Sequence, residues 1–146
     1  MQQEKTKNIE VEIRERLDSI AEFKKTLDRT KAQQMYSVYV CDVYFCVKTA
    51  NKVEDVEMDE VGSYSLRLRK SKKGGDKEKF TINTKTITNH GDHNAWEEHE
   101  VEVSDFSEVA KIFNMTEFKP FFKLEKKRFV YKLDNMEICV EDITNF

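Results

Sequence analysis

The segment Ile9-Glu10-Val11-Glu12-Ile13-Arg14 begins an alternation of apolar and charged residues that continues to Leu17. Alternation with a period of two predicts a strand with apolar side chains on one face and charged side chains on the other. On the charged face, Glu10 and Glu12 are two residues apart and are followed by Arg14. A solvated sheet face usually mixes charged with uncharged polar residues, so a face made of full charges suggests a binding surface.

The same periodicity recurs along the chain and is interrupted by two segments with helical spacing. We expect helices at Asp18–Thr30 and at Phe106–Asn114, the second preceded by a capping-box-like Asp105 and Glu108. The short turns between neighbouring strands, such as Asp134-Asn135, imply an antiparallel sheet and an α+β fold. Besides the first segment, the predicted strands are Met35–Val47, Tyr64–Lys70, Glu78–Thr88, Trp96–Val103, Phe121–Leu133 and Glu137–Ile143.

Composition excludes several classes of protein. Charged residues make up 36% of the 146 residues but nearly cancel to a net charge of −3, unlike the strongly basic balance of a duplex-binding protein. Aromatic residues make up 11%, which argues against disorder. No apolar run exceeds Val43–Val47, so we expect no membrane-spanning helix. Three cysteines, an odd number, argue against a disulfide framework; we expect a cytoplasmic protein with Cys41, Cys46 and Cys139 buried.

Charges of one sign repeat at a spacing of two residues. Acids do so at Glu10/Glu12 and Glu98/Glu100, and bases at Arg67/Arg69 and Lys126/Arg128. Residues two apart in a strand point the same way, about 6–7 Å apart. Paired carboxylates suit a hard divalent cation, and paired guanidinium groups suit neighbouring phosphoryl groups. A solvated sheet face remains one interpretation; the other is a barrel whose lumen binds a polyanion together with Mg²⁺.

Seven short motifs follow one another along the chain: Ile9–Arg14, Asp42–Phe45, Ser65–Arg69, Phe80–Lys85, Glu97–Asp105, Leu124–Tyr131 and Ile138–Ile143. In this order they resemble the motifs of the CYTH, or triphosphate tunnel metalloenzyme, superfamily. The first resembles its Glu-x-Glu-x-Lys signature and the third its Ala-Leu-Arg-x-Arg motif. The second resembles the Asp-x-Tyr-Phe motif of the class IV adenylyl cyclase branch.

The resemblance implies a single domain over residues 1–146, folded as an eight-stranded antiparallel barrel with helices outside. It implies Mg²⁺ or Mn²⁺ as cofactor and a triphosphate-containing small molecule, such as ATP, inorganic triphosphate or thiamine triphosphate, as ligand. Catalytic roles would fall to Glu10, Glu12 and Arg14. The metal ligands would be Glu10, Glu12, Glu98, Glu100 and Glu141. The phosphate-binding residues would be Arg14, Arg67, Arg69, Lys85, Lys126 and Arg128.

The chain departs from the family pattern in places. Arg14 stands where the family has a lysine, and arginine cannot act as a proton-transfer base at ordinary pH. The family aspartate near the end corresponds to Glu141, or to Asp142 with a one-residue slip that would turn the side chain to the other face. The family continues beyond Phe146 with a final Glu-x-Glu strand, so we expect seven strands and an open edge. An open edge invites pairing with another chain, such as a homodimer partner.

Three functions are compatible with these residues. The first is a metal-dependent cyclase that converts ATP to cyclic AMP and pyrophosphate. The second is a triphosphatase that hydrolyses inorganic, thiamine or nucleoside triphosphate. The third is a non-catalytic module that binds polyphosphate or nucleotide without turnover. The cyclase is the leading interpretation, because of the motif at Asp42–Phe45.

Overall fold

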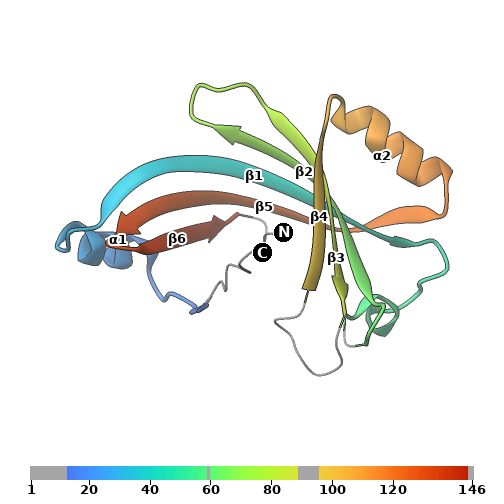
Figure 1. Ribbon diagram of the computed structural model, residues 1–146, viewed down its shortest axis with the longest axis horizontal. Helices are drawn as coiled ribbons and strands as arrows, with labels where there is room; N and C mark the ends of the chain where they lie inside the picture. The colour runs from blue at the N-terminus through green and yellow to red at the C-terminus, as the bar shows by residue number, and fades with distance from the viewer. Residues whose placement is uncertain (1–12, 59, 89–95, 145–146) are drawn as a thin grey trace, which may run out of the picture. The chain divides into compact units, whose positions relative to one another are not determined.

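The computed structural model describes residues 13–58, 60–88 and 96–144 and divides the chain into two compact units, Met1–Lys31 and Ala32–Phe146 (Figure 1). In the described part of the first unit, helix α1 spans Ile20–Asp28. The Ser19 side chain caps α1 by accepting a hydrogen bond of 3.2 Å from the Glu22 backbone N–H. The helix expected at Asp18–Thr30 is therefore confirmed, with slightly shorter bounds.

The strand predicted for Ile9–Leu17 is not formed in its described part. Residues 13–17 have no strand structure, and Ile13 is 83% exposed; residues 9–12 lie outside the described ranges. Alternation predicts which face of a strand would be apolar, but a strand also needs a neighbouring strand to satisfy its backbone hydrogen bonds. Residues 13–19 pair with none of the described strands.

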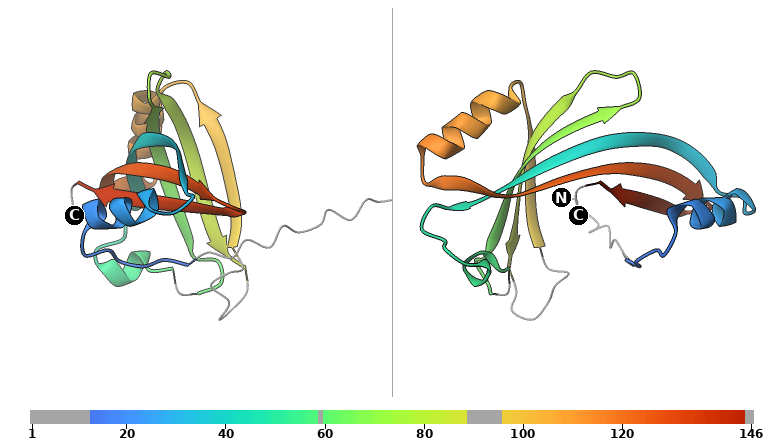
Figure 2. Two further views of the ribbon diagram at one scale, coloured as in Figure 1. Left: turned by 90° about the vertical axis from the view of Figure 1, so that its left-hand side faces the viewer. Right: turned by 180° about the vertical axis from the view of Figure 1, so that it is seen from behind.

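The second unit is built on one antiparallel sheet of six strands in the order β4-β3-β2-β1-β5-β6 (Figure 2). Its α+β class is as predicted. The eight-stranded barrel that the resemblance implied and the seven strands expected for this chain are both wrong for the described residues, whose six strands form an open sheet. The sheet ends at β4 on one side and β6 on the other, and no described segment joins these edges. The elements are β1 (Gln33–Val47), a 3₁₀ turn (Val53–Val56), β2 (Tyr64–Lys73), β3 (Lys79–Ile87), β4 (Trp96–Val103), α2 (Phe106–Met115), β5 (Phe118–Leu133) and β6 (Met136–Ile143).

The strand predictions from residue 35 onward are confirmed, with small differences at the ends. The turn predicted at Asp134-Asn135 joins β5 to β6, and Asp134 has φ +51°, a left-handed conformation that tight hairpin turns require. β5 begins at Phe118, before the predicted Phe121, because β1 pairs with β5 along almost the whole length of both strands.

The β1–β5 pairing contains a bulge. Its register shifts between Tyr44, which pairs with Phe122, and Phe45, which pairs with Pro120, so Phe121 is the extra residue.

Helix α2 covers one face of the sheet, here called the outer face. Asp105 caps the helix as predicted, accepting a hydrogen bond of 3.0 Å from the Glu108 backbone N–H. The Phe113 ring packs edge-to-face against Phe45 of β1, with ring centroids 5.0 Å apart. Leu68, which is fully buried, also points to this side, because it alternates with the bases of β2. The apolar core therefore lies between α2 and the sheet.

Two of the three cysteines behave as expected. Cys41 and Cys46 are buried, but Cys139 is exposed, so that part of the prediction is wrong. Cys139 lies on the edge strand β6, where only one neighbouring strand can cover it.

Candidate functional site

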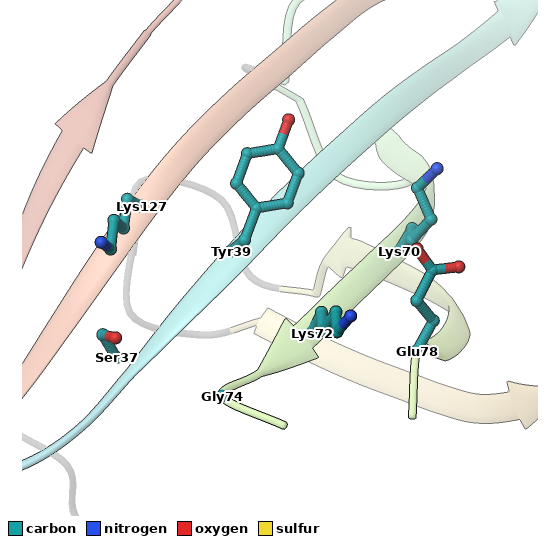
Figure 3. Close-up of a pocket in the computed structure, with 7 residues that line it drawn as sticks. All are labelled: Ser37, Tyr39, Lys70, Lys72, Gly74, Glu78 and Lys127. Carbon is teal, nitrogen blue, oxygen red and sulfur yellow. The ribbon is translucent and has the colours of Figure 1, made fainter. Parts of the chain in front are cut away.

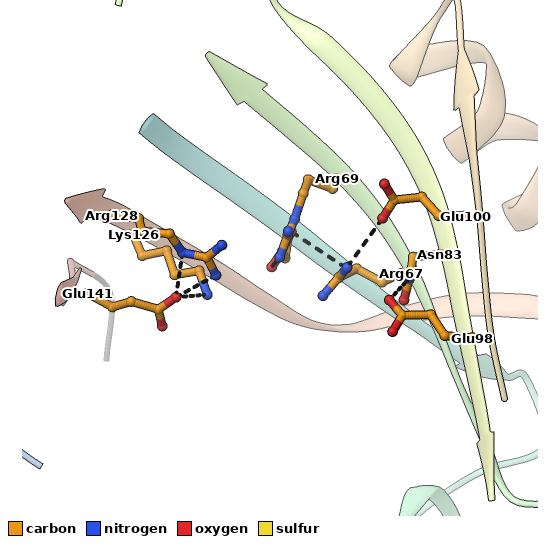
Figure 4. Close-up of polar contacts among 9 residues, drawn as sticks. Arg67, Arg69, Asn83, Glu98, Glu100, Lys126, Arg128 and Glu141 are labelled. Atoms are coloured by element: carbon orange, nitrogen blue, oxygen red, sulfur yellow. Dashed lines mark hydrogen bonds and ion pairs between the residues drawn. The ribbon is translucent and has the colours of Figure 1, made fainter. Parts of the chain in front are cut away.

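The face opposite α2, here called the inner face, carries charged side chains from all six strands, and Figure 4 shows most of them. Directly paired residues of antiparallel strands point to the same face. One row across the sheet therefore runs from Asp42 of β1 through Arg69 of β2 to Thr81 of β3. The next row runs from Tyr44 through Arg67 to Asn83 and ends at Glu100 of β4.

A buried ion pair anchors the first row. Asp42 is 1% exposed and accepts hydrogen bonds from Arg69 Nε at 2.7 Å and Arg69 Nη2 at 2.8 Å. Burial alone lowers the pKa of Arg69, but the hydrogen bonds and negative charge of Asp42 outweigh it and raise that pKa. The guanidinium is therefore charged and held in one orientation.

Arg67 beside this pair retains unused binding capacity. Its Nε lies 4.0 Å from Asp42 Oδ1 and its Nη2 lies 4.0 Å from Glu100 Oε2, which are ion-pair distances but too long for hydrogen bonds. Arg67 Nε and Thr81 Oγ1 are buried, and neither makes a hydrogen bond within the described residues. Buried polar atoms are nearly always hydrogen-bonded, so these two are candidates to contact an oxygen-rich ligand.

The acids of β4 line the edge of the inner face. Glu98 accepts a hydrogen bond of 2.6 Å from Asn83 Nδ2 and lies 3.5 Å from Lys85 Nζ. The side chains of Glu98 and Glu100 are about half exposed, at 47% and 46%. Mg²⁺ commonly binds through one or two carboxylates and keeps several water ligands, so this pair fits such an ion. No group of three or more metal-ligating side chains occurs among the described residues.

A second basic pair lies at the other end of the inner face. Lys126, only 7% exposed, donates a hydrogen bond of 2.9 Å to Glu141 Oε1, and Arg128 Nε donates one of 2.8 Å to the same oxygen. Burial alone would raise the pKa of Glu141, but these hydrogen bonds outweigh it and lower that pKa. Because Arg128 pairs with Glu141 and Lys127 with Asp142, Glu141 is the acid on the inner face.

The structure thus brings most of the sequence-predicted site residues onto one face. Those on the inner face are Arg67, Arg69, Lys85, Glu98, Glu100, Lys126, Arg128 and Glu141. Arg14 is exposed and belongs to the first unit, and Glu10 and Glu12 lie outside the described residues. Asp42, Asn83 and Thr81 were not among the site residues predicted from the sequence. The signal for Asp42 was an acid within an otherwise apolar strand of high β propensity.

A separate group of bases lies on the outer face, around a hollow of about 280 Å³ (Figure 3). Tyr39 pairs with Lys72 on one side and Lys127 on the other, so all three point together. Lys127 precedes Arg128 and follows Lys126, and alternation turns it away from them. These lysines therefore do not belong to the inner-face cluster.

Comparison with known proteins identifies the family. The family model for the CYTH domain matches residues 8–145. PH1819 from Pyrococcus horikoshii has a TM-score of 0.67 at 18% identity, over 87% of this chain and 68% of that one. A conserved hypothetical protein from Pyrococcus furiosus has a TM-score of 0.62 at 25% identity, over 86% and 66%. A "putative adenylate cyclase" from Vibrio parahaemolyticus has a TM-score of 0.61 at 11% identity, over 90% and 67%.

The chain spans about two thirds of the length of each of these solved structures. A comparison with curated proteins finds no match. The family match covers nearly the whole chain and agrees with the resemblance of the seven sequence motifs. The chain therefore belongs to the CYTH domain family.

Proposed function

We propose that this CYTH domain belongs to a divalent-metal-dependent enzyme that acts on triphosphates, with the reaction of a class IV adenylyl cyclase. Members of the family are generally enzymes, triphosphatases or cyclases, and generally depend on a metal. The observation that carries the proposal is the buried Nε of Arg67, which makes no hydrogen bond within the described residues although two acids lie 4.0 Å from this guanidinium. A phosphate oxygen would supply the missing acceptor.

The other inner-face bases extend this phosphate site. Arg69 uses two of its five donor N–H groups on Asp42 and keeps the others for a ligand. Lys85, Lys126 and Arg128 would bind further phosphoryl oxygens, and the family resemblance gives Arg14 the same role. Arginine pairs are suited to this role because the planar guanidinium binds two oxygens at once.

We propose Glu98 and Glu100 as ligands of Mg²⁺ or Mn²⁺, together with Glu10, Glu12 and Glu141. When bound, the ion would neutralise phosphate oxygens and the charge that develops on the leaving group. Within the described residues, Glu98 and Glu100 are the acids best placed for this, since both are partly exposed on the inner face. Glu141 already accepts hydrogen bonds from two bases and would have to exchange them for a metal contact.

In the proposed cyclase reaction, the ribose 3′-oxygen of ATP bonds to the α-phosphorus. The bond from that phosphorus to the bridging oxygen of the β-phosphate breaks, and pyrophosphate leaves with the electron pair. The 3′-hydroxyl proton passes to a base. Arg14 cannot be that base, because arginine stays protonated at ordinary pH. The motif at Asp42–Phe45 supports the cyclase, as does the label of the Vibrio parahaemolyticus neighbour.

Location and assembly also remain proposals. No helix in the described residues is long and apolar enough to cross a membrane. We propose a cytoplasmic single domain that binds no duplex nucleic acid. Among the described strands, β4 and β6 each pair on one side only. This supports a homodimer, because an unpaired edge can add a strand from another chain.

Thermal unfolding with inorganic tripolyphosphate and with ATP, each with Mg²⁺ or with chelator, tests the proposal. Ligand at a hundred times its Kd stabilises the folded state by about 2.7 kcal/mol. We expect a metal-dependent shift that Arg67→Gln abolishes and that Lys72→Gln, which removes a base from the outer face, leaves unchanged. Product analysis then separates cyclic AMP and pyrophosphate from released phosphate. If neither ligand shifts the transition of the wild-type chain, the proposal is wrong; a shift without turnover identifies a binding module.

A further inference from the structure

A groove of about 640 Å³ adjoins the row of Arg67. Tyr44 lines it and stands directly opposite Arg67 in the β1–β2 pairing. Residues paired in this way have Cβ atoms about 4.5–5.5 Å apart. Phe122 and Leu124 of β5 also line the groove, and their partners in β1 are Tyr44 and Asp42. Part of the lining of the groove therefore lies on the inner face, beside the proposed phosphate site.

The bulge in β5 concentrates aromatic rings in this groove. Because Phe121 is the extra residue of the bulge, two consecutive phenylalanines contact the same partner. The ring centroid of Tyr44 lies 6.4 Å from that of Phe121 and 6.0 Å from that of Phe122. These rings are nevertheless open to solvent, with Phe121 47% exposed and Phe122 46% exposed; Tyr64, which also lines the groove, is 43% exposed. Large apolar side chains gathered in one exposed patch usually mark a binding site.

The charge of the groove is opposite to that of the phosphate site. Its charged lining residues are the acids Asp55, Glu57 and Glu60, and it includes no lysine or arginine among the described residues. The Asp55 carboxylate accepts a hydrogen bond of 2.9 Å from the Asn51 backbone N–H, which lowers the pKa of Asp55 and keeps it charged. An anionic phosphate is therefore repelled from the groove and attracted to Arg67. A ligand with a phosphate end and an uncharged or cationic end would bind with its phosphates at Arg67 and its other end in the groove.

We propose that this groove binds a planar ring in the organic part of a triphosphate ester. The substrate is then a ring-bearing triphosphate, and inorganic triphosphate is the weaker ligand. The inference rests on the proposed function, because it takes the phosphates to lie on the inner-face bases. The aromatic side chains stack on the ring, and the acids that line the groove favour a ring that carries N–H donors or a positive charge.

The test compares ligands that differ in the ring. Affinities of the chain are measured by calorimetry for ATP, thiamine triphosphate and methyl triphosphate, an ester without a ring, with tripolyphosphate as the reference. Loss of one stacking partner typically weakens binding about five- to a hundredfold. We expect Phe122→Ala to weaken a ring-bearing ligand by that factor and to leave methyl triphosphate unchanged. Tyr64→Ala repeats the test at a second exposed residue that lines the groove.

Tyr39→Ala is the matched control, because Tyr39 is 42% exposed but lies on the outer face. The inference is supported if ATP or thiamine triphosphate binds more tightly than methyl triphosphate, and if this difference is lost in Phe122→Ala and kept in Tyr39→Ala. The tighter of the two ring-bearing ligands then shows whether a neutral or a cationic ring fits. Equal affinity for all three esters, unaffected by either groove variant, overturns it while leaving the proposed function intact. Failure to bind any of the three esters or tripolyphosphate refutes the proposed function, and the inference with it.

Discussion

Replacement of Asp42 by alanine tests the central ion pair of the inner face. The Asp42 side chain is 1% exposed and that of Arg69 is 18% exposed, so the substitution leaves a largely buried guanidinium without its two hydrogen-bond acceptors. Breaking a buried pair from one side costs about 3–5 kcal/mol. For a domain of this size, we expect a loss in Tm of about 6–20 °C. Urea unfolding followed by far-ultraviolet circular dichroism measures the change in the free energy of unfolding.

A second variant separates the pair from general disruption of the core. Arg69→Met removes the guanidinium but keeps much of the volume, and Asp42→Ala/Arg69→Met removes both charges. We expect the double variant to be at least about 1 kcal/mol more stable than the sum of the two single effects predicts, because neither charge is then left unpaired. Additive effects, or an Asp42→Ala variant within about 1 kcal/mol of the wild type, would refute the argument that this pair holds the inner face together.

The remaining predictions concern the acids of the inner face. The pKa of Glu141 is lowered in the folded chain, so its stabilising contribution is present above its ordinary value of 4.5 and is lost as the pH falls through the lower folded value. Between pH 7 and pH 3 the wild type should therefore lose more stability than Glu141→Gln; equal losses would contradict the ion pair with Arg128. Replacing Glu98 and Glu100 by glutamine should abolish the Mg²⁺-dependent part of the thermal shift with tripolyphosphate, whereas Glu97→Gln, on the other face of β4, should retain it. An unchanged Mg²⁺ effect in the double variant would exclude these two acids as metal ligands.

Local patterns were sufficient to predict most strands and both helices. The alternation of charged and apolar residues placed the bases of β2 and β5 on one face, and the sheet confirms that arrangement. Closure of the sheet was not predictable, because it depends on which distant segments pair at the edges rather than on any local period. The first predicted strand illustrates this limit: Ile13–Leu17 alternates clearly and still forms no strand in the described residues.

The role of Asp42 and the aromatic groove both depend on register, which the sequence pattern does not contain. Asp42 meets Arg69 because β1 and β2 pair at that offset, and a shift by one residue would turn the carboxylate to the other face. The groove depends on the bulge at Phe121, where one extra residue places two aromatic rings against Tyr44. If the same residues of β1 and β5 paired regularly, without the bulge, the two rings would not both lie against Tyr44.

The two basic pairs of the inner face are held in different ways, which suggests different roles toward a phosphate ligand. Both Lys126 and Arg128 contact the one oxygen Glu141 Oε1, on an acid that is about one third exposed, so an arriving phosphate could replace that oxygen as the acceptor. Asp42, by contrast, is fully buried and keeps Arg69 in place whether or not a ligand is bound. Arg67 stands between these extremes, near two acids but hydrogen-bonded to neither. Its guanidinium can accept a phosphate without breaking an existing hydrogen bond to either acid, and this is why Arg67→Gln is the most informative single change for triphosphate binding.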